Sequence, residues 1–596
     1  MKDHPLVQSL LLQPLKGFTD QLRNIGLGKG VPPLFFCFDE ISNLQDPHTK
    51  ESGYSDLNVP VALKRVISMM IDIPVWSFVL STRKPLTVLA PPVTRDPSSR
   101  VRSALRIPVR PFFAFTTGVG QRIRMQTQRA QELSRPLSDF SLVQNVCQHG
   151  RPLWQSYGDT RESPMSSIEI RSMVLSKLLD RQGNPIPTPD LEARSDVLAI
   201  LSARLTLDLV FNDDDSSVLE ETLIHSKLRV ITDIDPTTDY VKSAWVEEPI
   251  VSEACAGYFS GDRSTSLCRE KWLDSLTLLY DQCLTVGLVD RGRTGELVGQ
   301  MLLLMGRDNV FANDKDDRSA RPDGNNLTWA SPFKLSTFLE LTFTKCDDIL
   351  KTPARIYAMN PQSGKSEELP PDGSRTTATL LGQGWLNFTH FVDTDQSLTK
   401  EELPEFLHGL LMHQAAAQLK PGQPGLDLLV PIYCGNPKLP FDRANLGALA
   451  IQIKNSKDRN VWNLDSEKLQ KIMPYIFPDD MPVLAIMLEL GVETTPRKST
   501  IEATRSYRNN LFSFRIIDKS QATFKFMSNA KLVKLINKIL KARDYEETDP
   551  QARVWTGNLP FRRHTFAARY PDEDEVDDGM DLDDDEDTND DADLYT

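Results

Sequence analysis

Two short apolar segments give the clearest pattern of hydrophobic and polar positions in the chain. Residues 425–433 read Gly-Leu-Asp-Leu-Leu-Val-Pro-Ile-Tyr, and residues 448–455 read Ala-Leu-Ala-Ile-Gln-Ile-Lys-Asn. Short runs rich in branched residues, separated by a loop of Gly, Asn and Pro, predict two adjacent β-strands. Because successive side chains of a strand point to opposite faces, Gln452 and Lys454 share one face of the second strand. The pattern therefore predicts that Asp427, Gln452 and Lys454 lie on neighbouring strands.

The hydrophobic periodicity elsewhere predicts further strands and helices around this pair. Residues 482–490 and 511–517 are apolar runs of strand length. Apolar residues at helical spacing over residues 403–419, preceded by Thr399 as a cap, predict a helix. The same period predicts helices over residues 168–179, 196–209, 274–284, 295–307 and 531–543.

The first 130 residues contain two apolar segments that end in polar residues. Residues 31–38 form a strand pattern followed by Asp39-Glu40, the form of a Walker B motif, in which the Asp holds the magnesium of a nucleotide. Residues 61–71 predict a helix, and a second strand at 75–80 ends in Ser81-Thr82, where P-loop ATPases have a polar sensor. Ordinary buried strands with polar ends are the alternative. The candidate residues of a degenerate nucleotide site are Asp39, Glu40, Ser81 and Thr82.

The phosphate-binding half of such a site is missing from this sequence. A Walker A loop reads G-x-x-x-x-G-K-S/T, because backbone amides cradle the phosphates and the lysine neutralises them. The nearest candidate, Gly26-Leu-Gly-Lys-Gly30, has no Ser or Thr after the lysine and leaves no room for a helix before Asp39. We therefore expect a truncated NTPase region without ATP hydrolysis. An active NTPase with an unusual phosphate loop is the alternative.

Length and composition bound the class of protein. With 596 residues, 40% hydrophobic and 25% charged, the chain is an ordinary globular protein in composition and long enough for several domains. No apolar run approaches the length of a membrane span, and the first thirty residues lack the pattern of a signal peptide, so we expect no membrane partner and an intracellular protein. The seven cysteines are scattered and never spaced as C-x-x-C, which predicts a reducing compartment and no structural zinc.

The acidic charge is concentrated at the C-terminus. The net charge is −14, but residues 572–593 hold fifteen acidic and no basic residues, which leaves 67 acidic against 68 basic residues elsewhere. Such a run cannot collapse and predicts a disordered tail. The tail is either a solubilising segment or a polyanion that competes with nucleic acid for a basic surface.

A basic surface is predicted on the helix over residues 531–543. Its apolar residues form one face, and four lysines follow another face at helical spacing: Lys531, Lys534, Lys538 and Lys541. A lysine stripe can neutralise backbone phosphates without reading sequence. The same stripe also fits a simple solvated helix face.

The polar residues of the central strand pair match the needs of phosphodiester cleavage. Hard oxygen ligands hold Mg²⁺ or Mn²⁺ against a phosphate, and a lysine orients water and offsets developing charge. Asp427 and Gln452 are the candidate metal ligands, and Lys454 is the candidate orienting cation. Glu402 or Glu405, at the start of the preceding helix, could add a further acid, although glutamates there also suit the helix dipole. Two half-buried strands with polar ends are the alternative reading.

This arrangement resembles the PD-(D/E)xK nuclease core in its Q-x-K variant. Leu426 stands where that family has its proline, and Gln452 is neutral where most members have a carboxylate. The resemblance implies a restriction-endonuclease-like α/β/α domain with Asp427, Gln452 and Glu405 as metal ligands and Lys454 as a catalytic residue.

Several segments, taken in order, resemble a group of fungal proteins related to the Crinkler-type effectors. They are Phe36-Cys-Phe-Asp-Glu40, Leu80-Ser-Thr82, Asp96-Pro-Ser-Ser-Arg100, Gly150-Arg-Pro-Leu153, Leu201-Ser-Ala-Arg-Leu205, Gly295-Glu-Leu297, Gly306-Arg-Asp308, Asn387-Phe-Thr-His-Phe391 and the segment 427–455. The resemblance implies a P-loop NTPase module followed by a nuclease module, acting on nucleic acid in a nucleus. DNA is the nucleic acid that we expect as partner.

We therefore expect an α/β protein built from several regions. They are a truncated P-loop NTPase-like region at 1–130, a helical region at 131–312, a linker at 313–326, a nuclease-like domain at 327–566 and an acidic tail at 567–596. The expected function is metal-dependent hydrolysis of nucleic acid with Mg²⁺ or Mn²⁺. The alternative is a catalytically inactive nucleic-acid- or protein-binding regulatory protein.

Overall fold

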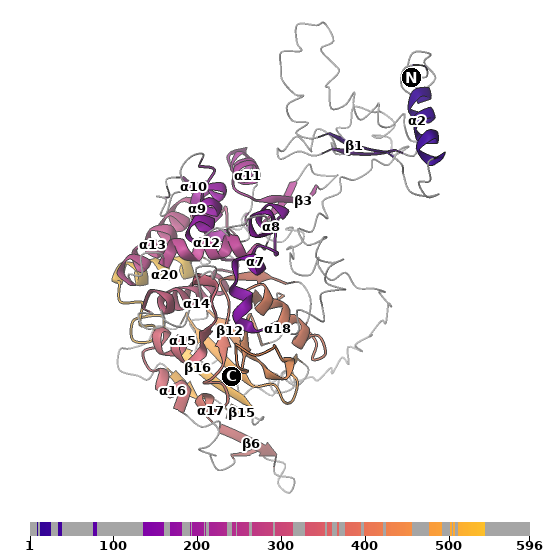
Figure 1. The fold of residues 1–596 in the computed structure, drawn as a ribbon. Coiled ribbons are helices and arrows are strands. Elements are labelled where there is room, and N and C mark those ends of the chain that lie inside the picture. Colours follow the sequence, from indigo (N-terminus) through magenta and orange to yellow (C-terminus); the bar gives the residue numbers. More distant parts are fainter. Residues whose placement is uncertain are drawn as a thin grey trace, which may run out of the picture.

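The structure is a computed structural model of the chain (Figure 1). It describes residues 9, 12–24, 34–38, 75–79, 135–159, 167–181, 191, 193–207, 209, 214–234, 241–245, 247–260, 265–289, 293–313, 328–351, 355–359, 366–368, 376–394, 398–420, 425–455, 476–491, 501–503, 505–506 and 510–542. Over these residues the protein is mixed α/β, with one large mixed sheet and many helices.

A nine-stranded sheet forms the centre of the described chain. Its strands are β5 (Phe333–Lys334), β8 (Trp385–Leu386), β9 (His390–Asp393), β10 (Ala415–Gln418), β11 (Leu428–Tyr433), β12 (Leu446–Lys454), β13 (Val483–Glu489), β14 (Ile501–Ala503) and β16 (Leu511–Ile517). The order is β14-β16-β13-β12-β11-β10-β9, with β8 on β11 and β5 on β8. Strands β12, β13 and β16 run parallel, whereas β11 is antiparallel to β12. The predicted neighbouring strands β11 and β12, and the predicted strands β13 and β16, are thus confirmed.

The central strands are buried on both faces, which explains their nearly continuous apolar sequences. Alternate residues belong to two separate hydrophobic cores. Leu428 and Ile451 pack in the core shared with helix α14 (Thr294–Asn313), and Leu429 and Ala450 pack in the core shared with helix α18 (Leu403–Met412). The sheet therefore lies between α14 on one face and α18 on the other.

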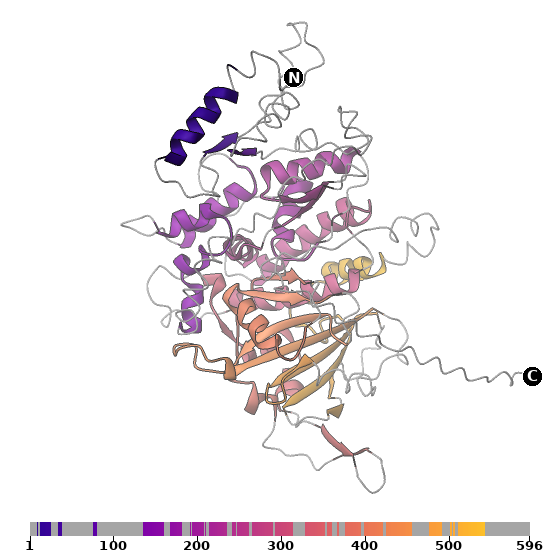
Figure 2. The ribbon, with the colours of Figure 1, turned by 90° about the vertical axis from the view of Figure 1, so that its right-hand side faces the viewer.

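Most other helices pack on the α14 side, and Figure 2 shows them beside the orange strands of the sheet. They are α7 (Val143–Val146), α8 (Pro152–Asp159), α9 (Ser167–Leu178), α10 (Arg194–Ser202), α11 (Asp214–Ser226), α12 (Pro249–Ser260), α13 (Thr265–Leu279), the π-helix η5 (Tyr280–Leu284), α15 (Leu335–Thr342), α16 (Cys346–Lys351), α17 (Thr377–Leu380) and α20 (Ala530–Lys541). The 3-10 turns are η4 (Leu137–Ser141), η7 (Thr328–Ala330) and η8 (Arg443–Asn445). Smaller sheets pair β3 (Val230–Ile234) with β4 (Val241–Ala244), and β6 (Arg355–Met359) with β7 (Ser366–Glu368) and β15 (Arg505–Ser506). No helix in the described part of the chain has the length and hydropathy needed to cross a membrane.

One hydrophobic core contains residues from both sides of the linker that the sequence predicts at residues 313–326. The core on the α14 side extends from Val143 to Leu540 and includes residues of the helical region and of the large sheet. Residues of 131–312 and of 327–566, predicted as separate regions, are therefore packed around the same core where they are described.

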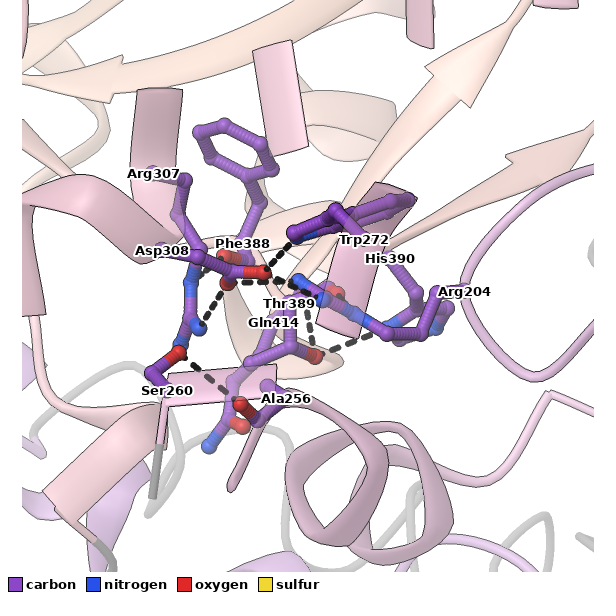
Figure 3. Close-up of polar contacts among 10 residues, drawn as sticks. All are labelled: Arg204, Ala256, Ser260, Trp272, Arg307, Asp308, Phe388, Thr389, His390 and Gln414. Atoms are coloured by element: carbon purple, nitrogen blue, oxygen red, sulfur yellow. Dashed lines mark hydrogen bonds and ion pairs between the residues drawn. The ribbon is translucent and has the colours of Figure 1, made fainter. Parts of the chain in front are cut away.

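A buried ion-pair network joins the helices to the sheet (Figure 3). The Arg204 guanidinium donates to both oxygens of Asp308, over 2.6 and 2.9 Å, and Trp272 Nε1 donates to the same carboxylate over 3.0 Å. Arg204 Nε also donates to the carbonyl oxygen of Thr389, just before β9, over 3.0 Å. Arg307 Nη1 is 3.0 Å from Asp308. Three of the segments that carry the resemblance thus meet here as a scaffold.

The structure corrects two predicted helix ends. The helix expected over residues 403–419 ends at Met412, and residues 415–418 form strand β10 instead. Gln414 has a φ of 53°, which ends the helix, and the alanines that follow pair with β9 and β11. Helix α10 ends at Ser202 rather than near residue 209.

The N-terminal region is described over three short elements. They are α2 (Gln13–Asn24), β1 (Leu34–Phe38) and β2 (Val75–Val79). The two predicted strands pair in parallel, with Phe38 opposite Val79. Asp39, Glu40, Ser81, Thr82 and the predicted helix 61–71 lie outside the described residues, as does the acidic tail.

Candidate functional site

Four neighbouring strands begin or end along the same edge of the large sheet, the edge that runs across the strands. Strand β11 begins directly after Asp427, and its antiparallel neighbours β10 and β12 end there, at Gln418 and Lys454. Strand β9 runs parallel to β10 and ends beside it, with Asp393 opposite Gln418. This edge therefore collects polar side chains from four strands.

Helix α14 begins against the same edge and approaches β12 closely. A Cβ at Gly299 would lie 3.0 Å from Ile453 Cγ1, and a Cβ at Gly295 would lie 3.2 Å from Asn455 Cβ. The two glycines, one helical turn apart, let the start of α14 lie directly on the end of β12. Glu296 stands between them in sequence and is thereby brought to the edge.

Asp427 lies at the centre of this group of charges. Its Oδ2 accepts a hydrogen bond from the Ile453 backbone N–H over 2.6 Å. Burial raises the pKa of the Asp427 carboxyl to about 6; the Ile453 hydrogen bond opposes this shift, the charge of Glu296 adds to it, and the charges of Lys454 and Arg293 oppose it. The carboxyl is thus ionised at pH 7 although it is largely buried.

Glu296 is a candidate functional residue that the sequence reasoning missed. Its carboxylate accepts from Arg293 Nε over 2.5 Å and from Gln418 Nε2. Arg293 Nη1 also lies 3.5 Å from Asp393. Glu296 is far from Asp427 in sequence, so no local spacing connects the two. The glycines at 295 and 299 were the available signal, because paired glycines one turn apart mark a close helix approach.

Gln452, near the end of β12, has a buried acceptor on the face of the sheet opposite α14, because its neighbours Ile451 and Ile453 pack on the α14 side. Its side chain is 6% exposed, and its Oε1 has no hydrogen-bond partner among the described residues. An unsatisfied buried acceptor costs about 1–3 kcal/mol, so a donor or a cation beside this oxygen would stabilise the fold. Lys454 follows two residues later on the same strand face and is partly exposed.

The two acids at this edge are ligands suited to a hard divalent cation. Asp427 and Glu296 offer carboxylates, the ligand chemistry that Mg²⁺ and Mn²⁺ prefer over the thiolate and imidazole ligands of zinc. No group of three or more His, Cys, Asp or Glu side chains suited to a metal occurs in the described part of the chain. A cation beside these two acids would lack the Gln452 oxygen predicted as a ligand, because Gln452 lies on the other face of the sheet.

The structure does not bring Glu405 or Glu402 to this edge. The Glu405 carboxylate pairs with Arg443, which precedes the start of β12, whereas Lys454 is at its other end, about 26 Å away at 3.3 Å per residue. Glu402 accepts from the Thr399 hydroxyl over 2.9 Å. Glu296, not Glu405, is the acid that lies with Asp427.

The lysine stripe of α20 is exposed and lies near the same edge. All four lysines, Lys531, Lys534, Lys538 and Lys541, are exposed, while the apolar face of the helix is buried. Asn455, just after β12, donates from Nδ2 to the Leu540 carbonyl oxygen over 3.0 Å and so ties the end of α20 to the end of β12. Lys538 Nζ also lies 5.2 Å from the centre of the Tyr280 ring.

Comparison with known proteins adds no family to this description. No protein-family model matches the chain, and no curated protein and no solved structure is similar to it.

Proposed function

We propose that this protein is a metal-dependent nuclease-like enzyme that hydrolyses nucleic-acid phosphodiester bonds. The observation that carries the proposal is the largely buried Asp427 carboxyl, on which the charges of Glu296, Lys454 and Arg293 act at one edge of the sheet. Buried carboxylates whose pKa is shifted by both burial and specific charges occur preferentially at functional sites.

The chain's own residues have separate roles in this proposal. Asp427 and Glu296 would hold Mg²⁺ or Mn²⁺, whereas the Gln452 oxygen lies on the opposite face of the sheet from α14. The bound cation would polarise a phosphate oxygen as a Lewis acid. The Ile453 N–H fixes the Asp427 carboxylate, so that one oxygen is bound to the backbone and the other is left for a ligand. Lys454 would orient the attacking water and offset charge that develops on the phosphate.

The lysines of α20 support a nucleic-acid substrate. Four exposed lysines on one helix, tied to the end of β12 through Asn455, form a positive surface that leads to the candidate site. Such a surface binds backbone phosphates without selecting sequence, so it suits DNA and RNA alike. DNA is the proposed substrate. A nucleus as the place of action and an inactive ATPase remnant at the N-terminus follow from the resemblance to Crinkler-related proteins.

A binding protein without catalysis is the second candidate. The small ligand set favours it, because the site has two carboxylates among the described residues and one of them is already paired with Arg293. In that case the two acids and the lysine surface would serve binding or regulation only.

Plasmid cleavage tests the proposal. The full chain with Mg²⁺ or Mn²⁺ is expected to nick or linearise supercoiled plasmid, and Asp427→Ala is expected to be more than about a hundredfold slower, because loss of a ligand removes several kcal/mol of charge stabilisation. Asp479→Ala, which removes an exposed acid paired with Lys400, is the matched control and should keep full activity. Plasmid binding without cleavage in either metal would favour the inactive protein instead.

A further inference from the structure

We propose that Gln418 is a positioning residue that orients the Glu296 carboxylate for a divalent cation, at the end of a directional chain of hydrogen bonds that begins at Thr206. This inference rests on the proposed function, because it assigns a role to Gln418 in the same site. It is carried by a set of buried contacts that the sequence reasoning did not anticipate.

The chain of hydrogen bonds joins three elements. Thr206, in the loop after α10, donates its backbone N–H to Gln300 Oε1 over 3.0 Å. Gln300, on α14, donates from Nε2 to the Thr206 hydroxyl over 2.7 Å and to Gln418 Oε1. The Thr206 hydroxyl also donates to Gln418 Oε1, and Gln418 Nε2 donates to Glu296 Oε2.

The order of donors and acceptors in this series of hydrogen bonds determines whether the oxygen or the nitrogen of each glutamine amide faces the next residue. A backbone N–H can only donate, so it holds Gln300 with Oε1 toward Thr206 and Nε2 toward Gln418. The Gln418 amide must then present Oε1 to these donors and Nε2 to Glu296. A turned Gln418 amide would place its oxygen against the carboxylate and its nitrogen against other donors. The chain thus specifies one orientation of Gln418.

The position of Gln418 suits the support of a metal ligand. Gln300 is 0% exposed and Gln418 is 2% exposed, so both amides are held by protein contacts. Glu296 and Gln300 are one turn apart on α14, and Gln418 on β10 bridges them. Gln418 and Arg293 both donate to Glu296 Oε2, so Arg293 offsets part of the carboxylate charge and Oε1 is the oxygen that would face a cation. Partners of this kind typically contribute about ten- to a hundredfold to metal affinity.

Mn²⁺ binding to the full chain, measured by electron paramagnetic resonance, tests this role independently of cleavage. Gln418→Leu is expected to weaken Mn²⁺ binding by about tenfold or more. Gln414→Leu is the matched control, because Gln414 is also fully buried, lies just before the same strand and donates to the Phe140 carbonyl oxygen over 2.7 Å, away from Glu296. The control is expected to lower Tm but to keep the wild-type Mn²⁺ affinity.

The outcomes separate this inference from the proposed function. Wild-type binding together with a Gln418→Leu affinity within twofold of wild type overturns the positioning role and leaves the metal site standing. Absence of Mn²⁺ binding by the wild-type chain overturns both. If Gln418→Leu does not fold, Thr206→Val decides, because it is nearly isosteric, keeps the backbone N–H and removes one donor to Gln418. A several-fold weaker Mn²⁺ affinity with unchanged Tm then supports the role, and an unchanged affinity overturns it.

Discussion

Asp427 is the residue at which burial and charge act on one carboxyl in opposite directions. Burial favours its neutral form, whereas the Ile453 N–H and the charges of Lys454 and Arg293 favour its ionised form. Burial prevails, and the pKa rises to about 6. A cation that binds here competes with a proton in the range where the protein is ordinarily studied.

This competition predicts a pH-dependent metal affinity. Below pH 6 the carboxyl is protonated, so Mn²⁺ affinity is expected to fall about tenfold per pH unit between about pH 6 and 4.5, and to be constant above about pH 7. Asp427→Asn keeps an acceptor for the Ile453 N–H but cannot ionise, and should bind Mn²⁺ weakly without this step. Isothermal titration at several pH values is the measurement, and a wild-type affinity that is flat from about pH 5 to 8 would contradict the role of Asp427.

The same pKa has a consequence for stability with the opposite sign. The folded-state pKa lies above the ordinary value of 3.8, so this carboxyl favours the folded state below about pH 4, and the contribution is lost as the pH rises through 6. In the absence of metal, Asp427→Asn is therefore expected to gain stability relative to wild type as the pH rises from about 4 to 7. The full effect is about 3 kcal/mol, visible as a change in the difference between the two Tm values.

Single elements were predictable from the sequence where the local pattern and the packing agree. Strands β11, β12, β13 and β16 are largely buried on both faces, and their apolar runs have the length of strands. Strand β10 was not predictable, because Ala415-Ala-Ala-Gln418 has a high intrinsic tendency to continue the helix before it. Its pairing with β9 and β11 overrides that tendency. The candidate site divides in the same way. Strand patterns in the sequence predict Asp427 and Lys454, whereas the place of Glu296 depends on packing between segments that are distant in sequence.

Helix α20 is the element whose charge can be tested separately from its fold. Replacing Lys531, Lys534 and Lys541 with Gln is expected to weaken binding to duplex DNA. The slope of log K against log salt should become shallower by up to about 0.9 for each phosphate that the helix no longer neutralises. The three side chains are exposed, so Tm should not change. Lys538 is kept because it lies over the Tyr280 ring.

The control for α20 carries the same change of charge elsewhere. Lys345, Lys351 and Lys438 are exposed lysines on other surfaces, and their replacement with Gln should leave the salt dependence as it is in wild type. Equal weakening by both triple variants would show that net charge, and not the α20 surface, determines DNA binding.

At the scale of the whole molecule, the helices on the α14 side and the large sheet share one core and one buried ion-pair network. Arg204, from the loop after α10, reaches both Asp308 on α14 and the backbone before β9 (Figure 3). Arg307 lies against the same carboxylate, and burial lowers the pKa of its guanidinium to about 10, so that it stays charged at pH 7. Asp308 therefore pairs with both buried arginines, and the charge of Glu253 also acts on Arg307.

Removal of that aspartate should destabilise the helices and the sheet together. Asp308→Ala leaves two buried guanidinium groups without their partner, a change that typically costs about 3–5 kcal/mol. Thermal unfolding is expected to show a lower Tm for the loss of helix and of sheet signals alike. Asp347→Ala, which removes only the exposed partner of Lys351, should not change Tm. Two separate transitions, of which only one shifts, would contradict a shared core.

The close approach of α14 to β12 limits which residues can replace Gly295 and Gly299. Where Gly295 and Gly299 lie against the strand, hydrogen atoms take the place of side chains, and the spacing between helix and strand is at its minimum. A larger residue at either position would push α14 away from β12. Glu296 would then move away from Asp427, although neither acid is altered. The distance between the two carboxylates therefore depends on two glycines, which have no side chain of their own.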